Sequence, residues 1–583
     1  MRRYLLAFMV TLSVSAGPAA RQSPYRTLND TFDPPRYASV DDWKQRVAWL
    51  RDHIFATAGL LPEPERTPLS PVVFDEVKRA DYTVAKAYFE SLPGFYVTGN
   101  LYRPAGPGPF PAILSPHGHW PYGRLENSEL ASVPGRAINL ARQGFVVFTY
   151  DMVGYNDSRQ LPHRTFGGRR EKLWGLTVSG LQLWNGIRAL DFLETLPYVR
   201  RDAIGVTGAS GGGTQTFMLA AVDDRVAVAA PVNMISLHMQ GGCVCENQPG
   251  LRLETTNVEI AGMIAPRPLL MVSATGDWTK NTMELEYPAV KRIYALAGAE
   301  DRVEGVRFKA DHNYNRDSRE AMYAFMGRWL QKAPGGERRA ERDFTPEMPQ
   351  DLLVFHGRAM PAGAVTASQL TENWIRAAQR QRASAPAETL QRALLHALHL
   401  EKAAPAAAKS NGSRTVLLAD ADPEVERALQ AAGFTVRPLA FTEVDETAAA
   451  KISEFEGYNR TTASRRVETI VAAARNAPGA TLVASGDAAL AGLLASAVAP
   501  IGRAILDVDG FDTSSDEDFL ARLYIPGLRR AGDLETAAAL AGGRIVVHNA
   551  GERFVVRGLE GQQGKLSARE IVDRIRGGAR KSE

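Results

Sequence analysis

The stretch Gly208-Ala209-Ser210-Gly211-Gly212-Gly213 lies between a short apolar run, Ile204–Val206, and an alanine-rich helical pattern. A serine on a sharp turn between a strand and a helix needs small neighbours, because the strained backbone leaves no room for bulky side chains. Gly208 and Gly212 meet this need. The pattern therefore predicts a nucleophile elbow at Ser210, and such a serine requires a histidine base and an acid elsewhere in the chain.

The first half of the chain alternates strand-like apolar runs with helical spacing. Such alternation predicts a mostly parallel sheet with helices on both faces, in which reactive side chains gather at the carboxyl ends of the strands. Helical spacing occurs at 37–61 and 179–196, and strand-like runs occur at 72–77, 82–90, 95–102, 111–115, 144–151, 204–206, 226–230, 269–274 and 306–310.

The candidate acid and base each follow one of these strands. Asp277 comes just after the run ending at 274, and His312 comes just after the run ending at 310. Their order with Ser210 is the one typical of the α/β-hydrolase fold, which we therefore expect here. Glu246 is the alternative acid, because hydrolases of this class place the acid after different strands.

The oxyanion of an acyl-transfer reaction needs preorganised N–H donors. One expected donor is the N–H of Gly211, and the second is the N–H of Gly118 or His119, which follow the strand at 111–115. The side chains of His117 and His119 either contact substrate or have structural roles. Three tryptophans are candidates for stacking on a sugar ring or for core packing, namely Trp120, Trp174 and Trp278.

Residues 40–332 resemble the acetyl xylan esterase and cephalosporin C deacetylase branch of the α/β-hydrolases. The resemblance is carried by Pro116-His117-Gly118-His119, by the elbow with Thr214-Gln215 after it, and by the Asp277 and His312 loops. It implies a metal-free triad of Ser210, Asp277 and His312 that removes acetyl groups from sugars. The chain departs from the family at 153–156, where those esterases carry an arginine-glycine-glutamine element, and in having a second domain.

The second half repeats segments of the first in order. Residues 140–147 match 429–436, 154–156 match 457–459, and 249–252 match 526–529, which indicates duplication of the domain. Aligning Val206 with Val483 places Ser210 opposite Asp487, and no histidine follows His548, so this copy is expected to be degenerate. The expected organisation is a signal peptide (1–20), a catalytic domain (21–335), a linker (336–350) and the degenerate hydrolase-like domain (351–583).

An insertion between Asn156 and Trp174 has no counterpart after Asn459, and it is either a substrate wall or a solvated loop. Cys243 and Cys245 are expected to be buried structural thiols, with a local disulfide as the alternative. Two thiols without a nearby histidine pair make a poor zinc site, so neither a metal nor a cofactor is expected.

The amino terminus carries two arginines, an apolar stretch at 4–14 and small residues at 15–20, which is the pattern of a secretory signal peptide. The mature protein is therefore expected to be periplasmic or secreted. The net charge of +3 and the spread of lysine and arginine along the chain, apart from a basic tail around residues 574–581, give no sign of nucleic-acid binding. No segment reaches the length of a membrane span. The oligomeric state is left open.

The leading functional hypothesis is a serine carboxylic-ester hydrolase that acts on a small-molecule or polysaccharide ester, such as acetylated plant polysaccharide. A serine peptidase related to prolyl oligopeptidase shares the elbow and the order of the triad, although no propeller repeat is present. The third hypothesis is a carbohydrate-binding or interaction protein that works through its second half.

Overall fold

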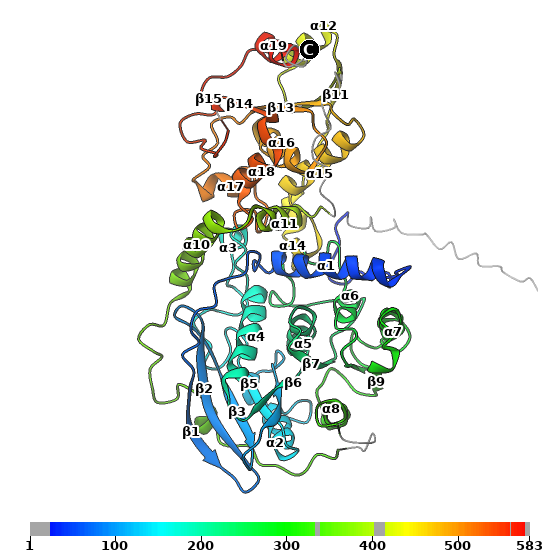
Figure 1. Cartoon of the computed structure of the whole chain (residues 1–583), viewed down its shortest axis with the longest axis vertical. Coiled ribbons are helices and arrows are strands. Elements are labelled where there is room, and N and C mark those ends of the chain that lie inside the picture. Colours follow the sequence, from blue (N-terminus) through cyan, green and yellow to red (C-terminus); the bar gives the residue numbers. More distant parts are fainter. Residues whose placement is uncertain (1–23, 333–338, 401–413, 560, 578–583) are drawn as a thin grey trace, which may run out of the picture.

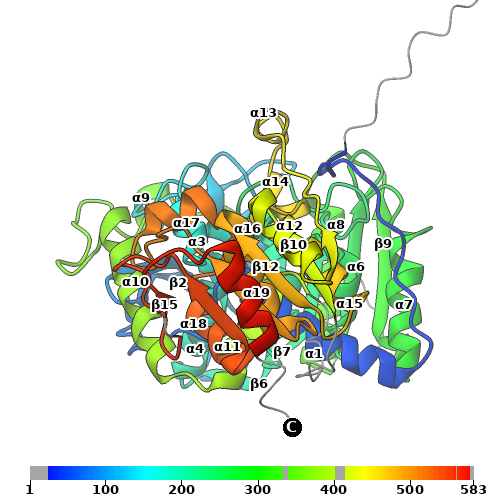
Figure 2. The same cartoon turned by 90° about the horizontal axis from the view of Figure 1, so that it is seen from above.

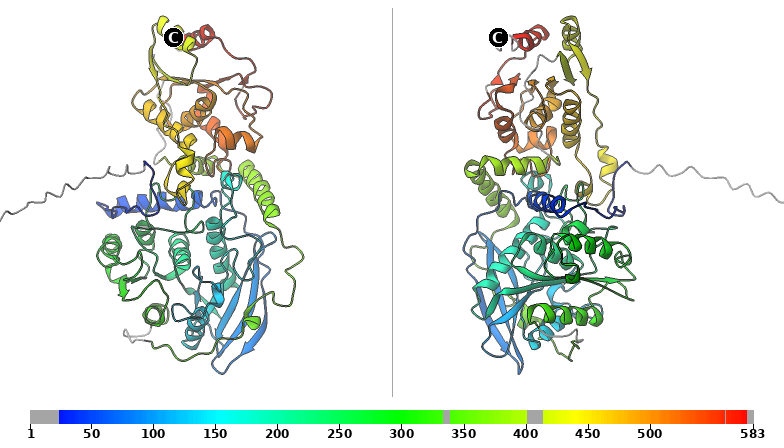
Figure 3. Two further views of the ribbon diagram at one scale, coloured as in Figure 1. Left: turned by 180° about the vertical axis from the view of Figure 1, so that it is seen from behind. Right: turned by 45° about the vertical axis from the view of Figure 1, so that its right-hand side comes forward.

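The computed structural model describes residues 24–332, 339–400, 414–559 and 561–577. The expected signal peptide, residues 1–20, lies outside this part of the chain, as do residues 336–338 of the expected linker. The described residues form two sheets, one above the other along the longest axis of the molecule (Figure 1), and the views from other sides show the same stacking (Figure 3). Seen from above, the second domain lies in front of the first (Figure 2).

The first domain is built on a nine-stranded sheet in the order β1-β2-β3-β5-β4-β6-β7-β8-β9. Strands β1, β2 and β3 are antiparallel to one another, and β3 joins the rest of the sheet by pairing antiparallel with β5. Strands β5, β4, β6, β7, β8 and β9 are parallel to one another. The strands are β1 (Val72–Lys78), β2 (Tyr82–Leu92), β3 (Phe95–Pro104), β4 (Phe110–Leu114), β5 (Val146–Tyr150), β6 (Val199–Ala209), β7 (Val226–Val232), β8 (Leu269–Ala274) and β9 (Val303–Phe308).

Helices cover both faces of this sheet, because each buried strand directs apolar side chains to both faces. One face packs against α1 (Val40–Thr57), α4 (Val178–Thr195), α5 (Gly211–Val222), α6 (Asn257–Gly262) and α7 (Glu286–Leu296), and the other against α2 (Val133–Arg142) and α8 (Arg316–Leu330). The expected α/β-hydrolase fold is confirmed, with the elbow serine between β6 and α5.

The second domain has a six-stranded, fully parallel sheet in the order β11-β10-β12-β13-β14-β15. Its strands are β10 (Thr415–Ala419), β11 (Thr435–Pro438), β12 (Thr481–Ser485), β13 (Arg503–Asp507), β14 (Ile545–His548) and β15 (Gly561–Gln562). Its helices are α11 (Ala387–Ala397), α12 (Pro423–Ala431), α13 (Glu446–Ala449), α14 (Phe455–Tyr458), α15 (Thr462–Arg475), α16 (Gly486–Val498), α17 (Asp516–Arg522), α18 (Asp533–Ala541) and α19 (Ala568–Gly577).

The strand order of the second sheet repeats the order of the six parallel strands in the first, since β5-β4-β6-β7-β8-β9 and β11-β10-β12-β13-β14-β15 follow the same path in sequence. The matched segments 140–147 and 429–436 occupy the same place in both domains, where a helix ends in a left-handed glycine, Gly144 or Gly433, before the second parallel strand. The second domain therefore repeats the parallel part of the first and has no equivalent of β1 to β3 within its described residues.

The structure corrects the alignment at the elbow by one residue. Val206 packs on the face of the first sheet that α4 and α5 cover. Val483 packs on the face of the second sheet that α12 and α19 cover, whereas α15 and α16 cover the other face. Because side chains alternate between the two faces of a strand, Val206 and Val483 are not equivalent. Gly486 follows β12 directly and has φ of +59°, as Ser210 follows β6 with φ of +58°. The residue opposite Ser210 is therefore Gly486 and not Asp487.

The two domains contact each other through reciprocal hydrogen bonds. In the first domain the N–H groups of Gly250 and Arg252 donate to the carbonyls of Glu456 and Gly457, at 2.7 and 2.9 Å. In the second domain the N–H groups of Gly527 and Arg529 donate to Lys172 and Leu173 in the first domain, at 2.8 and 3.2 Å. The duplicated segments 249–252 and 526–529 thus dock in the same way, as in an interface between two copies of one fold.

This reciprocity makes Lys172 equivalent to Glu456, and the two side chains form an ion pair of 2.8 Å. The same offset makes Thr177, the N-cap of α4, equivalent to Thr461, the N-cap of α15. The expected match of 154–156 with 457–459 was therefore wrong. The insertion ends in α3 (Arg169–Leu173) and Trp174, whose indole N–H donates to Asp516 at 2.9 Å, so Trp174 lies at the domain junction.

The segment between the sheets does not follow the expected boundary at residue 351. Leu352 of α9 (Pro349–Leu352) and Leu370 and Trp374 of α10 (Ala367–Ser384) pack into the core clusters of the first domain. An amphipathic helix is stabilised mainly by burying its apolar face, and the buried apolar residues of α10 belong to the core of the first domain. In the second half of the chain, the residues of the second core begin with α11, and Leu173 of α3 packs into the same core.

Among the described helices, none combines the length and apolar character that crossing a bilayer requires.

Candidate active site

Ser210 occupies a strained turn at the carboxyl end of β6. Its φ and ψ are +58° and −127°, in a region that residues other than glycine seldom adopt. The N–H of Ser210 donates to the Val232 carbonyl at 3.1 Å, and the Ser210 carbonyl accepts from the Thr214 N–H at 3.0 Å. Strand β7 and helix α5 therefore both hold the turn in place. Gly211 is the first residue of α5, where an N–H has no intrahelical acceptor.

The glycines around Ser210 allow the loop after β4 to approach the elbow. A Cβ on Gly208 would lie 2.5 Å from the carbonyl oxygen of Pro116, and one on Gly212 would lie 2.6 Å from the same atom. A Cβ on Gly118 would lie 2.8 Å from the Ala209 oxygen and 3.1 Å from the Ser210 Cβ. The structure therefore brings Gly118 and Gly211, two of the expected oxyanion donors, to Ser210.

Asp277 and His312 meet across the loops that follow β8 and β9. Nδ1 of His312 lies 2.8 Å from Oδ2 of Asp277, and the Asp277 side chain is only 2% exposed. The other carboxylate oxygen of Asp277 accepts from the Thr279 N–H at 2.7 Å and from the Thr279 hydroxyl at 2.5 Å. Thr279, which the sequence analysis did not single out, fixes the carboxylate, and an aspartate followed by a threonine two residues later was the available signal.

The imidazole of His312 lies against two tryptophan rings. The Trp278 ring centroid is 4.4 Å from that of His312, and the Trp120 centroid is 5.8 Å away. Nε2 of His312 is buried and makes no hydrogen bond to any described residue. Both tryptophans are partly exposed, so they line the immediate surroundings of this nitrogen.

The alternative acid, Glu246, has different partners. Its carboxylate accepts from the Gly242 N–H at 2.8 Å and lies 3.5 Å from the Thr214 hydroxyl, and no hydrogen bond joins it to His312 in the described residues. Burial raises the pKa of Glu246. The geometry thus pairs Asp277, and not Glu246, with the histidine.

Of the two expected roles of His117, substrate contact or structure, its surroundings fit the structural one. His117 is 1% exposed, its Nδ1 lies 2.7 Å from the Gly118 carbonyl, and its Nε2 accepts from the Met152 N–H at 3.0 Å. Burial lowers the pKa of His117 to about 3, so the ring is neutral at physiological pH. Both nitrogens are occupied by backbone groups, and His117 holds the loop after β4 against the loop after β5.

The side chain of His119 turns toward the cysteines. Its Nε2 lies 3.1 Å from Cys245 Sγ, and Nε2 of His163 lies 3.4 Å from Cys243 Sγ. The expectation that no histidine pair lies near the thiols was wrong, because the fold brings residues 119 and 163 to residues 243 and 245. His163 belongs to the insertion after Asn156, whose start therefore lies beside the elbow. These four side chains are the group in the described residues that could hold a metal ion.

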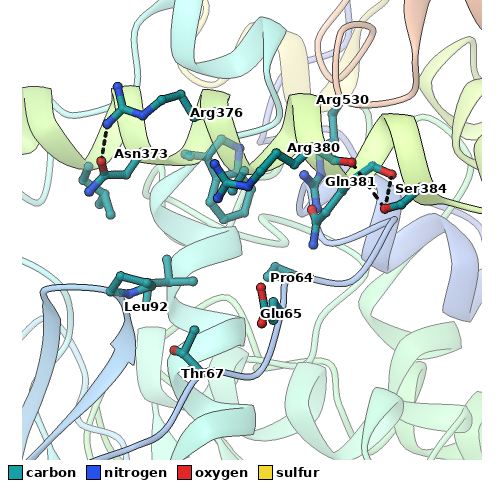
Figure 4. A pocket seen from close by; sticks show the side chains of 14 residues that line it. Pro64, Glu65, Thr67, Leu92, Asn373, Arg376, Arg380, Gln381, Ser384 and Arg530 are labelled. Atoms are coloured by element: carbon teal, nitrogen blue, oxygen red, sulfur yellow. Dashed lines mark hydrogen bonds between the residues drawn. The ribbon is translucent and has the colours of Figure 1, made fainter.

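A separate cavity lies away from this site. It has a volume of about 410 Å³ and is lined by side chains of α10, by Pro64, Glu65 and Thr67, and by Arg530 of the second domain (Figure 4). Ser210, Asp277 and His312 do not line it. It lies where α10 crosses the first domain, so it has no part in the chemistry of the elbow.

Comparison with known proteins identifies the family. A family model described as X-Pro dipeptidyl-peptidase (S15 family) matches residues 94–262. The chain is 26% identical over 308 residues to "Putative hydrolase YtaP" of Bacillus subtilis (strain 168), and the alignment covers 48% of this chain and 98% of that protein. Among solved structures it is 30% identical to "Methylesterase BT1017", with a TM-score of 0.50 over 60% of this chain and 78% of that chain. This chain belongs to the α/β-hydrolase esterases.

Membership agrees with the first domain as described above, and it makes this protein an esterase-type serine hydrolase. The acetyl xylan esterase from Paenibacillus sp. R4 is also similar in structure, at 20% identity and a TM-score of 0.36, over 52% of this esterase and 98% of that chain. Membership in this family confirms the expected enzyme class, a serine esterase.

Proposed function

We propose that this esterase is an exported serine carboxylic-ester hydrolase that removes acyl groups, acetyl above all, from plant polysaccharides or oligosaccharides through an acyl-enzyme. The proposal is carried by the hydrogen bond between His312 and Asp277 at the edge of the sheet where the Ser210 elbow lies. A histidine oriented by a buried carboxylate is what an unactivated serine hydroxyl requires.

In the proposed reaction the Ser210 oxygen attacks the ester carbonyl and forms a new C–O bond. His312 Nε2 takes the hydroxyl proton and then delivers it to the departing sugar oxygen as the ester C–O bond breaks, and Asp277 stabilises the imidazolium. Water then repeats the cycle on the acyl-enzyme and releases the acid. The tetrahedral oxyanion is stabilised by the N–H of Gly211 and by that of Gly118 or His119.

Trp120 and Trp278 support the sugar side of the proposal. They flank His312 and are partly exposed, so their rings are available to a sugar at the point where its oxygen leaves. The amino-terminal signal pattern supports export, which would bring the enzyme to a polymeric substrate outside the cytoplasm.

A second candidate function is hydrolysis of methyl esters on uronic acids, favoured by the 30% identity to a protein named a methylesterase. A third is peptide hydrolysis, favoured by the match of residues 94–262 to the S15 peptidase model. All three use the same nucleophile and differ in the group that leaves.

Product analysis separates them. The purified enzyme is incubated with acetylated xylan, methyl-esterified pectin, a glucuronoyl ester and an X-Pro peptide, with Ser210→Ala as the blank. We expect acetate to be released fastest. Methanol as the main product would replace the acetyl proposal by the second candidate, and a free amine as the main product would replace it by the third.

A further inference from the structure

A cluster of four soft ligands lies beside the nucleophile elbow. One ring nitrogen of His119, one ring nitrogen of His163, and the Sγ atoms of Cys243 and Cys245 all lie within 4.8 Å of one another. Two of these separations are the contacts of 3.1 and 3.4 Å given above, and three of the four residues are buried. No step of the proposed ester hydrolysis uses these atoms.

The size of the cluster suits a tetrahedral ion. Zinc binds sulfur at about 2.3 Å and imidazole nitrogen at about 2.0–2.1 Å, so the ligand atoms of a tetrahedral site lie roughly 3.3–3.8 Å apart. The two contacts of 3.1 and 3.4 Å lie near this range, and the other separations are at most 4.8 Å, so side-chain movements of up to about 1 Å would close the site. Two cysteines and two histidines form a common ligand set for structural zinc.

Neighbouring hydrogen bonds already orient the ligands. Nδ1 of His163 lies 2.6 Å from the Val153 carbonyl, which puts the ring proton on Nδ1 and leaves the Nε2 lone pair directed at Cys243. Such a second bond to a backbone carbonyl is typical of a metal-binding histidine. The side-chain amide of Asn247 donates to the carbonyls of Gly241 and Cys243, at 2.8 and 3.1 Å, and so fixes the loop that carries both thiols.

We propose that His119, His163, Cys243 and Cys245 bind one zinc ion in a closed, structural site. Binding releases two protons, one from each thiol, and the two thiolates balance the charge of Zn²⁺, so the complex is neutral among buried residues. Four protein ligands leave no open position for water or substrate, so the ion does not take part in the hydrolysis.

The ion would join three segments that are distant in sequence, namely the loop after β4, the insertion after Asn156 and the loop at 241–247. His119 is the link to the elbow, because a Cβ on Gly211 would lie only 2.6 Å from its Cε1. His119 is thus a positioning residue, whose side chain would hold the loop after β4 against the start of α5.

The test uses the full-length protein, purified with a reducing agent and no chelator, incubated with zinc chloride and dialysed. Metal content per chain is measured by inductively coupled plasma mass spectrometry for wild type, Cys245→Ser and His163→Ala. The matched control is His238→Ala, since His238 lies outside the cluster beside Thr31. We expect one zinc per chain in wild type and control, and a loss of at least tenfold in both cluster variants.

Cobalt substitution gives a second readout that does not depend on how the variants fold. The cobalt-loaded wild type should show the intense visible bands of a tetrahedral site and sulfur-to-cobalt charge transfer, and its melting temperature should fall when the metal is removed by a chelator. Wild type that retains no metal after dialysis, or that contains a Cys243–Cys245 disulfide under the reducing conditions, would overturn the proposal.

Discussion

Oδ2 of Asp277 lies 2.8 Å from Nδ1 of His312, although 35 residues separate them in the sequence. The contact exists because β8 and β9 are neighbouring parallel strands, so the loops at their carboxyl ends lie side by side. The same relationship puts Glu246, on the loop after β7, out of hydrogen-bond contact with His312 in the described residues.

Replacing the acid therefore separates the two candidates. We expect Asp277→Asn to lower kcat for an aryl acetate by roughly 10³–10⁴, because the imidazole loses the partner that fixes its tautomer and stabilises its charge. Glu246→Gln should change kcat by less than about tenfold, since it keeps an acceptor for the Gly242 N–H. Loss of activity in Glu246→Gln with retention in Asp277→Asn would exchange the two assignments.

Thr279 is expected to act through Asp277. Thr279→Val removes the hydroxyl bond to the carboxylate but keeps the backbone bond, so kcat should fall by about tenfold with KM unchanged. Thr279→Ser keeps the hydroxyl and should restore kcat. Equal kcat values for the valine and serine variants would show that this hydroxyl does not position the acid.

Much of this site could be predicted from the sequence, because each part is a local signal. The elbow needs glycines next to Ser210, and Asp277 and His312 each follow an apolar run that forms a parallel strand. The pairing of Asp277 rather than Glu246 with His312 could not be decided in the same way. It depends on where the loop after β7 turns, which is set by hydrogen bonds within residues 241–247.

Three buried histidines at the junction of α1 and α11 predict that stability falls in acid. Burial lowers the pKa of His396 to about 4 and that of His399 to about 3, and it lowers that of His53 as well, with Arg46, Arg392 and Arg460 adding repulsion. Each ring binds its proton in the unfolded chain near pH 6.5 but not in the folded one. The contribution of these neutral histidines to the free energy of unfolding is therefore fully present above about pH 6.5. Below that pH it falls by about 1.4 kcal/mol for each histidine and each pH unit.

The measurement is urea unfolding at pH 7.5 and pH 5, in wild type and His396→Leu. The variant should lose less stability between the two values than wild type. Comparing the two proteins is necessary because Glu454, whose pKa burial raises to about 7, contributes in the opposite direction. An identical loss in both proteins would show that His396 does not contribute.

Asp487 should be dispensable for turnover. Its carboxylate forms ion pairs of 2.9 Å with Arg466 and Arg522, at a place in the second domain next to the residue equivalent to Ser210. We expect Asp487→Ala to leave kcat unchanged and to lower the free energy of unfolding by about 1 kcal/mol, since these pairs are partly exposed. A fall in kcat of tenfold or more would contradict the view that the second domain carries no catalytic group.

The duplication could be recognised in the sequence, but its register could not. Side chains alternate between the two faces of a strand, so a shift of one residue in aligning β6 with β12 exchanged the faces and placed Asp487 opposite Ser210. The cluster of His119, His163, Cys243 and Cys245 was missed for a different reason. Its members lie on three loops, and no spacing in the sequence shows that the fold brings them together.

The most direct test of the central claim is to find the acyl group on the enzyme. Wild type and Ser210→Ala are mixed with an aryl acetate, quenched in acid during turnover, digested and analysed by mass spectrometry. The account predicts one acetyl group on the peptide that contains Ser210 in wild type, and neither acetylation nor turnover in Ser210→Ala. Turnover in Ser210→Ala, or acetylation of a different residue in wild type, would contradict it.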